Sequence, residues 1–211
     1  MSATEGRAGA ATAGAEPSAM RAAVILLHGR GSTAQDILSL AGPLSADGLA
    51  FFAPEAEGGA WYPYSFLEPI EKNEKGIARG FAAIDGLVAY LAERGLSSRR
   101  IFFGGFSQGA CLCLDYVARH ADSYAGVFGL SGGLIGPALN ARDYSGSLAG
   151  VPLLLGCSDA DPYIPKERVL ETADVMQRLG ALVTTRLYPR APHAVNDDEI
   201  GLVHDMIRAR I

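Results

Sequence analysis

The fold of this chain is decided by Arg100-Ile101-Phe102-Phe103-Gly104-Gly105-Phe106-Ser107-Gln108-Gly109-Ala110. An apolar, strand-like run leads into Gly105-x-Ser107-x-Gly109, and a helix-like pattern follows over 110–120. This order is typical of a nucleophile elbow, a strand-to-helix turn that holds its serine in a strained backbone conformation. We expect the two glycines to be required because a Cβ at either position would clash with the opposite limb of the turn. The turn would expose the Ser107 hydroxyl and direct the first N–H groups of the helix at its target.

A second match to the same pattern occurs at Gly129-Leu130-Ser131-Gly132-Gly133. Ser131 also follows an apolar run, but the Gly- and Pro-containing stretch 132–137 cannot open a helix. We therefore interpret Ser131 as a strand-end serine in a glycine-rich loop and predict that Ser107 is the nucleophile.

The composition excludes several classes of protein. The chain has 211 residues, 49% of them hydrophobic, and a formal net charge of −5. A charge of this sign gives no bulk attraction to nucleic acid or to anionic membranes. The longest strongly apolar run, 22–27, is far too short to span a bilayer. The three cysteines show no zinc spacing, so we interpret them as small buried thiols in a reducing compartment and expect a cytoplasmic protein.

The first twenty residues are rich in Ala, Gly, Ser and Thr. They lack both the basic and the apolar region of a standard secretory signal. We predict a disordered extension over 1–20, followed by a single domain over 21–211. Met1 and Met20 both remain candidate start sites.

Strand-like and helix-like stretches alternate along the rest of the chain. The strand-like runs are 22–27, 49–52, 100–104, 125–130, 151–156 and 182–188. The helix-like stretches are 33–44, 77–94, 108–120, 165–179 and 197–210, and Asn196 with Glu199 is predicted to form a capping box. This alternation predicts an α/β fold with a mostly parallel, doubly wound sheet flanked by helices.

Two long stretches, 53–75 and 132–150, fit neither element, and both follow a strand. Loops of this length in a compact domain are usually functional. In an open α/β sheet, ligands bind beyond the carboxyl ends of the strands, which is where both loops would lie.

A serine hydroxyl needs a neighbouring base to act as a nucleophile at neutral pH, and four histidines are available. His193 lies in a loop between the last strand and the last helix, so it can reach Ser107. His120 would cap the helix after the elbow. His204 lies inside the last helix, and His28 directly follows the first strand. We therefore predict that His193 is the general base.

The base needs an acid, and a carboxylate-bearing loop follows the strand at 151–156. It offers Asp159 and Asp161, one of which could instead cap the next helix. The order Ser, Asp, His is that of the α/β-hydrolases. For the oxyanion hole we expect the backbone N–H groups of Gln108 and Arg30. The Arg30 guanidinium is expected to be solvated or to meet an acidic part of the substrate.

Six motifs occur in one order along residues 21–211. They are Leu27-His28-Gly29-Arg30-Gly31, Trp61-Tyr62-Pro63, Gly105-Phe106-Ser107-Gln108-Gly109-Ala110, Gly129-Leu130-Ser131-Gly132, Asp161-Pro162-x-Ile164-Pro165 and the late His193. This set resembles the phospholipase/carboxylesterase family, which includes acyl-protein thioesterases and small bacterial carboxylesterases. The resemblance implies an α/β-hydrolase fold, Asp161 rather than Asp159 as the triad acid, catalysis without a metal or organic cofactor, and often a homodimer. One departure is that the family often has His-Gly before the acid loop, where this chain has Cys157-Ser158.

We expect no large cap domain over the site. The aromatic stretch after the second strand should supply one wall of the acyl pocket through Trp61, Tyr62 and Phe66, with Leu134 opposite. The sequence therefore predicts a serine carboxylesterase that hydrolyses short to medium acyl esters through an acyl-enzyme. An acyl-protein thioesterase or lysophospholipase is the alternative within the same class. A non-catalytic binding protein with a hydrolase fold is the alternative from another class.

Overall fold

The computed structural model describes residues 9–139 and 144–211. In this part of the chain one sheet has the strand order β1-β3-β2-β4-β5-β6-β7. The strands are β1 (Ala10–Gly14), β2 (Ala22–Leu27), β3 (Leu49–Pro54), β4 (Ile101–Phe106), β5 (Gly126–Leu130), β6 (Pro152–Ser158) and β7 (Leu182–Tyr188). β1 pairs antiparallel with β3, and the other pairs are parallel. The predicted α/β fold with a mostly parallel sheet is confirmed.

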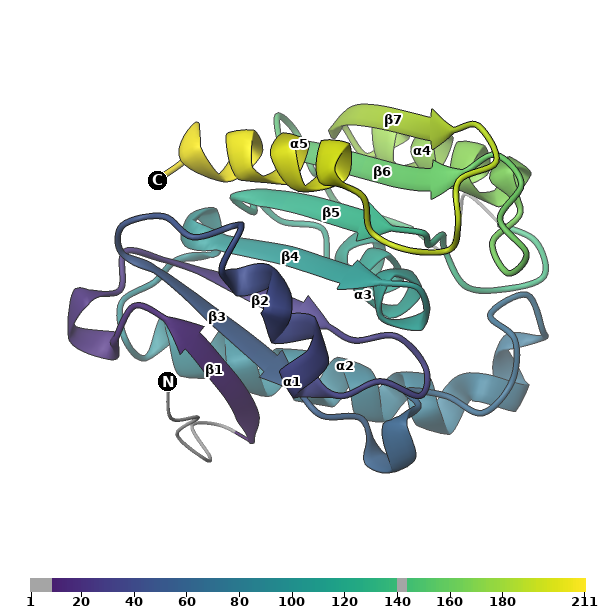
Figure 1. Cartoon of the computed structure of the whole chain (residues 1–211). Helices are drawn as coiled ribbons and strands as arrows, with labels where there is room; N and C mark the ends of the chain where they lie inside the picture. The colour runs from purple at the N-terminus through teal and green to yellow at the C-terminus, as the bar shows by residue number, and fades with distance from the viewer. Residues whose placement is uncertain (1–8, 140–143) are drawn as a thin grey trace.

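Helices cover both faces of this sheet (Figure 1). They are α1 (Ala34–Ile37), α2 (Ile70–Ala92), α3 (Gln108–Arg119), α4 (Lys166–Arg178) and α5 (Asp197–Arg208). α1 and α5 lie on one face, and α2, α3 and α4 lie on the other. α5 begins with the predicted capping box, because Asn196 and Glu199 each accept a hydrogen bond from the other's backbone N–H.

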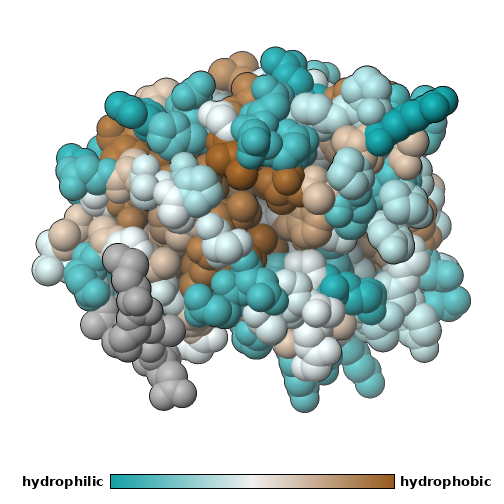
Figure 2. All heavy atoms as spheres, viewed as in Figure 1, coloured by the Kyte–Doolittle hydropathy of each residue, from teal (hydrophilic) through white to brown (hydrophobic). Residues whose placement is uncertain are grey.

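The sheet separates two apolar cores, and β2 contributes to both. Its residues Ala22, Val24 and Leu26 pack in the core under α1 and α5. The alternate residues of the same strand pack in the larger core under α2, α3 and α4. A strand buried on both faces has to be apolar at every position, which explains the continuous run in the sequence. On the outside of the α1 and α5 face, apolar residues gather in a band between the two helices (Figure 2).

The predicted disorder over 1–20 is wrong where the structure describes the chain. Residues 10–14 form β1, which runs antiparallel to β3 from Ala10 opposite Pro54 to Gly14 opposite Ala50. A short 3₁₀ helix follows at Pro17–Ala19. Small residues offer little apolar surface, so the composition resembles disorder. Their backbone nevertheless satisfies the N–H and C=O groups along the edge of β3. Residues 1–8 lie outside the described residues.

Two helix boundaries also differ from the predictions. The stretch 33–44 folds as the short α1 followed by a 3₁₀ helix at Leu38–Ala41. α2 begins at Ile70 rather than 77, so part of the predicted loop 53–75 is helical. The first turns of α2 bind that loop, because the buried side chain of Asn73 accepts from Tyr64 N and donates to Ser65 O. None of the helices in the described ranges could cross a bilayer, since each is too short or too polar.

Gly76 lets α2 approach the loop that precedes it. A Cβ at Gly76 would lie 2.5 Å from Trp61 O and 2.7 Å from Tyr62 Cα, both backbone atoms. At Gly86, further along α2, an added Cβ would meet open space.

We predict opposite effects of alanine at these two glycines. Gly86→Ala should raise the free energy of unfolding by about 1 kcal/mol, because alanine favours the helix. Gly76→Ala should lower it by about 1–3 kcal/mol, because the methyl group displaces packed backbone. Urea unfolding of both variants measures the difference. Stabilisation by both substitutions would show that the loop is not packed against Gly76.

Candidate active site

The turn at Ser107 joins the end of β4 to the start of α3. Ser107 has φ 54° and ψ −121°, a left-handed conformation that is costly for a residue with a side chain. A Cβ at Gly105 would lie 2.6 Å from Gly109 C, which is the expected clash across the turn. A Cβ at Gly109 would instead collide with the backbone of Leu27 and His28 at the end of β2. The second glycine is therefore required by a different neighbour from the one predicted.

Ser107, His193 and Asp161 lie in one chain of hydrogen bonds. His193 Nε2 lies 2.9 Å from Ser107 Oγ, and His193 Nδ1 lies 2.7 Å from Asp161 Oδ2. When Nδ1 carries the proton and donates a hydrogen bond to the carboxylate, Nε2 faces the serine hydroxyl as an acceptor. Phe106 and Tyr163 flank the imidazole, each with its ring centroid 4.9 Å away. The three side chains can thus abstract a proton from Ser107 and stabilise the resulting imidazolium.

The loop after β6 gives its two carboxylates different partners. Asp161 Oδ1 accepts from Tyr163 N at 2.9 Å and from Ile164 N at 3.0 Å. Burial alone would raise the pKa of Asp161, but the hydrogen bonds from His193 and these two N–H groups hold it below its ordinary value. Asp159 Oδ1 instead accepts from Arg190 N at 2.8 Å. Neither carboxylate caps α4, whose N-cap is Pro165. The carboxylate that contacts His193 is that of Asp161.

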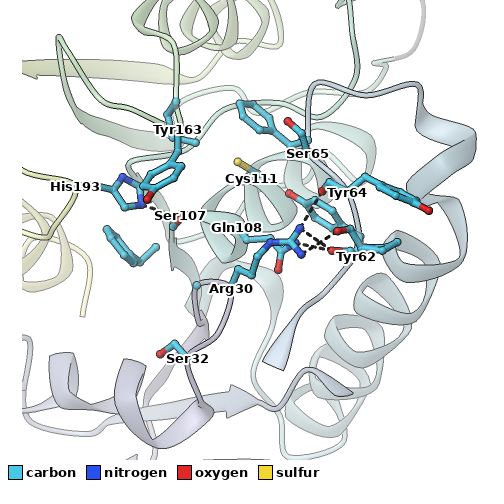
Figure 3. Close-up of a pocket in the computed structure, with 15 residues that line it drawn as sticks. Arg30, Ser32, Tyr62, Tyr64, Ser65, Ser107, Gln108, Cys111, Tyr163 and His193 are labelled. Carbon is cyan, nitrogen blue, oxygen red and sulfur yellow. Dashed lines mark hydrogen bonds between the residues drawn. The ribbon is translucent and has the colours of Figure 1, made fainter. Parts of the chain in front are cut away.

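Arg30 and Gln108, the residues expected at the oxyanion hole, line the same cavity as Ser107. Gln108 is the first residue of α3, where backbone N–H groups have no partner within the helix. The Arg30 guanidinium donates to the carbonyl oxygens of Tyr62, Pro63 and Tyr64 (Figure 3). Arg30 is exposed, as expected, but its guanidinium is also held by these three backbone acceptors, which the sequence did not predict.

The Gln108 side chain binds the same loop. It donates to Tyr62 O at 2.8 Å and accepts from Trp61 N at 3.0 Å. Trp61 Nε1 donates to His28 O at 2.8 Å. Both residues expected to supply oxyanion donors thus hold the loop 61–64 against the end of β2.

His28, to which the sequence gave no role, is fully buried beside this loop. Its Nε2 accepts from Ala56 N at 3.0 Å, so Nδ1 carries the proton and donates to Gly29 O at 2.8 Å. The only sign in the sequence of this structural role was the position of His28 directly after an apolar, strand-like run. The other histidines lie as expected: His120 Nδ1 bonds Tyr116 O at the end of α3, and His204 lies within α5.

A cavity of about 600 Å³ opens beside Ser107 (Figure 3). Its lining includes Tyr62 and Phe66, as predicted, together with Tyr163 and Ile164 from the acid loop. Trp61 and Leu134, which were predicted to form its walls, do not line it. Both are buried in the core under α2, α3 and α4, and Trp61 is held there by its hydrogen bonds.

Among residues 9–139 and 144–211, no group of three or more His, Cys, Asp or Glu side chains is placed to hold a metal ion. The chemistry that these residues can perform is nucleophilic attack by a serine whose proton is taken by a histidine.

Comparisons with known proteins agree with the fold. The family model described as phospholipase/carboxylesterase matches residues 12–211. The acyl-protein thioesterase 1 of Schizosaccharomyces pombe is 30% identical over 174 residues, 76% of this chain and 77% of that protein. The lysophospholipase-like protein 1 of Mus musculus is 29% identical over 129 residues, 61% of this chain but 54% of the mouse protein.

The structural comparisons point the same way. The crystal structure of a phospholipase/carboxylesterase from Dyadobacter fermentans superposes with a TM-score of 0.90 at 38% identity. The superposition covers 93% of this chain and 94% of that one. The esterase PE8 shares the fold with a TM-score of 0.80 at 23% identity, over 95% of this chain and 97% of its own.

We predict that the two serines in G-x-S-x-G patterns behave differently. Ser107→Ala and His193→Ala should each lower kcat on the order of 10⁶-fold, with the double variant little worse, because nucleophile and base act as a unit. Ser131→Ala should keep about half of its turnover or more, since Ser131 is buried and does not line the cavity. Hydrolysis of p-nitrophenyl acetate measures all four variants. An inactive Ser131→Ala beside an active Ser107→Ala would reverse the assignment of the nucleophile.

The two carboxylates should also be separable. Asp161→Asn is expected to lower kcat by roughly 10⁴-fold, because an amide favours the wrong tautomer of His193. Asp159→Asn should have a small effect, since its amide oxygen still accepts from Arg190 N. Steady-state kinetics of both variants test this, and comparable losses would contradict the roles given to the two residues.

Proposed function

The chain belongs to the phospholipase/carboxylesterase family, a family of serine hydrolases. On this premise we propose that it is a serine carboxylesterase for short to medium acyl esters. The observation that carries the proposal is the hydrogen-bonded chain from Ser107 through His193 to Asp161, at the wall of a cavity large enough for a small ester.

The reaction proceeds in two halves. His193 Nε2 takes the proton of Ser107 Oγ as that oxygen attacks the ester carbonyl carbon. The backbone N–H groups of Arg30 and Gln108 bind the oxyanion that develops. The tetrahedral intermediate collapses, its bond to the alcohol breaks, and His193 donates its proton to the departing alkoxide. Water, activated by the same histidine, then attacks the acyl-enzyme and releases the acid and Ser107.

The shape of the cavity supports the preference for short to medium acyl groups. Tyr62 and Cys111 are buried at its wall, so the space is closed on that side by the packed interior. Tyr64 and Tyr163 are the exposed aromatic residues of its lining, with 55% and 67% of their surfaces accessible. Exposed rings at the opening can contact the alcohol part of an ester while the acyl part occupies the interior.

Acyl-protein thioesterase or lysophospholipase activity is the second candidate, because relatives that match this chain carry those names. Both would use the same three residues and differ in the length of the acyl group and in the leaving group. A homodimer and a cytoplasmic location stay predictions from the sequence.

We predict that activity towards p-nitrophenyl esters peaks at short to medium acyl chains. The kcat/KM values should fall by about 10-fold or more at sixteen carbons, because a cavity closed at Tyr62 and Cys111 leaves the end of a long chain in water. A series of chain lengths, run beside palmitoyl-CoA and a palmitoylated peptide, measures this. A maximum at the palmitoyl substrates would instead favour the thioesterase.

A fluorophosphonate probe separates an enzyme from a binding protein of the same fold. The probe should label the wild-type protein at Ser107 and leave Ser107→Ala unlabelled, because labelling requires an activated serine. A wild-type protein that takes up no label and hydrolyses no ester would contradict the proposed function.

A further inference from the structure

Cys157 lies at the end of β6, next to the carboxylate that orients His193. Its side chain is buried, and its Sγ lies 3.7 Å from Asp161 Oδ2. That oxygen is the one that accepts from His193 Nδ1 at 2.7 Å. Burial, together with the negative charge of Asp161, raises the pKa of the Cys157 thiol to about 12. The thiol therefore keeps its proton and acts as the donor to the carboxylate.

Ser131, the serine of the second G-x-S-x-G pattern, lies behind this thiol. Its backbone N–H donates to Gly156 O at 2.7 Å, which holds the residue at the end of β6. It has φ 51° and is buried. The Ser131 side chain lowers the pKa of the Cys157 thiol, against the rise that burial causes. Ser131 is thus held beside Cys157 through the backbone of Gly156, and the Cys157 thiol contacts the same oxygen of Asp161 that His193 uses.

We propose that Cys157 is a positioning residue of the active site, and that Ser131 in turn positions Cys157. The proposal rests on the proposed function, since it assigns a role in orienting His193 through Asp161. The two N–H groups on Oδ1 fix one side of the carboxylate, and the thiol restrains the side that faces His193. This assignment gives both the second serine pattern and the cysteine before the acid loop a place in the site.

The thiol also affects the charge of the oxygen that it contacts. A donor to Oδ2 takes up part of the negative charge that would otherwise stabilise protonated His193. Glu199 of α5 also acts on Cys157, because its negative charge raises the pKa of the thiol. Burial raises the pKa of Glu199, and its carboxylate accepts from Asn196 N in the capping box. The variants below leave Glu199 and His193 in place, so a change in pH dependence reports the thiol.

The first test compares Cys157→Ala with Cys157→Ser on p-nitrophenyl acetate. Cys157→Ala should lower kcat about 5-fold, the loss of one modest hydrogen bond. Its KM should not change, because Cys157 does not line the cavity. Cys157→Ser retains an O–H donor and should recover kcat to within about 2-fold of wild type. Cys113→Ala is the matched control, because Cys113 is another fully buried thiol, on α3.

The second test is the pH profile of kcat/KM. With the donor removed, more charge on Oδ2 favours protonated His193, so the acid limb should move up by about 0.5 pH unit in Cys157→Ala. The limb should stay at the wild-type position in Cys157→Ser and in Cys113→Ala. A residue that only fills space would leave the limb unmoved in all three variants.

The third test uses Ser131 and does not depend on the stability of Cys157→Ala. Ser131→Ala should lower kcat about 2-fold on its own and should have no further effect when Cys157 is already alanine, because the two act in series. If Cys157→Ala fails to fold, the comparison of Cys157→Ser with Ser131→Ala carries the test, with folding checked by thermal unfolding.

Three results would overturn the inference: wild-type kcat and acid limb in Cys157→Ala, equal losses in Cys157→Ser and Cys157→Ala, or an equal loss in Cys113→Ala. Each can occur in a protein whose Ser107 is labelled by a fluorophosphonate, which would leave the proposed function standing. Absence of labelling would remove the proposed function itself.

Discussion

The close approach of α3 to the ends of β2 and β4 is the constraint on which the site depends. Gly105 and Gly109 have no room for a Cβ, the first because of the other limb of the turn and the second because of the backbone at Leu27 and His28. The turn at Ser107 is therefore built from three close contacts between main chains. As a result, Ser107, the first N–H of α3 and the loop after β2 are neighbours because of main-chain packing alone.

The side chains of Arg30 and Gln108 extend this packing to the aromatic loop. Both donate to Tyr62 O, so the loop that forms one wall of the cavity is hydrogen-bonded to the two residues proposed to bind the oxyanion. The backbone N–H groups of Arg30 and Gln108 are therefore ordered when the protein folds, and they need no reorganisation during the reaction. An electrostatic site of this kind depends on rigid dipoles, and here a guanidinium and an amide supply the rigidity.

The sequence was sufficient for features that depend on local patterns and insufficient for those that depend on distant contacts. The elbow, the parallel strands and the loop position of His193 follow from glycine spacing, apolar runs and element order. The edge strand β1 was missed because its partner, β3, begins 35 residues after Gly14 closes the strand — a backbone pairing with no side-chain signature. Trp61 was predicted at the pocket wall because its hydrogen-bond partners, Gln108 and His28, lie in other parts of the chain. The residues themselves left Asp159 and Asp161 equivalent, since both follow the same strand.

The structure shows why the acid loop contains both carboxylates. β6 and β7 are parallel neighbours, and Asp159 N donates to Tyr188 O at the end of β7. The Asp159 side chain then accepts from Arg190 N, a residue with φ 51°, and so holds the turn that leads to His193. Asp161, two residues later, contacts the imidazole itself. One carboxylate therefore sets the path of the chain that carries His193, and the other sets the orientation of the imidazole ring. A histidine on a loop needs both kinds of restraint if it is to act as a base, because a loop supplies neither by its own hydrogen bonding.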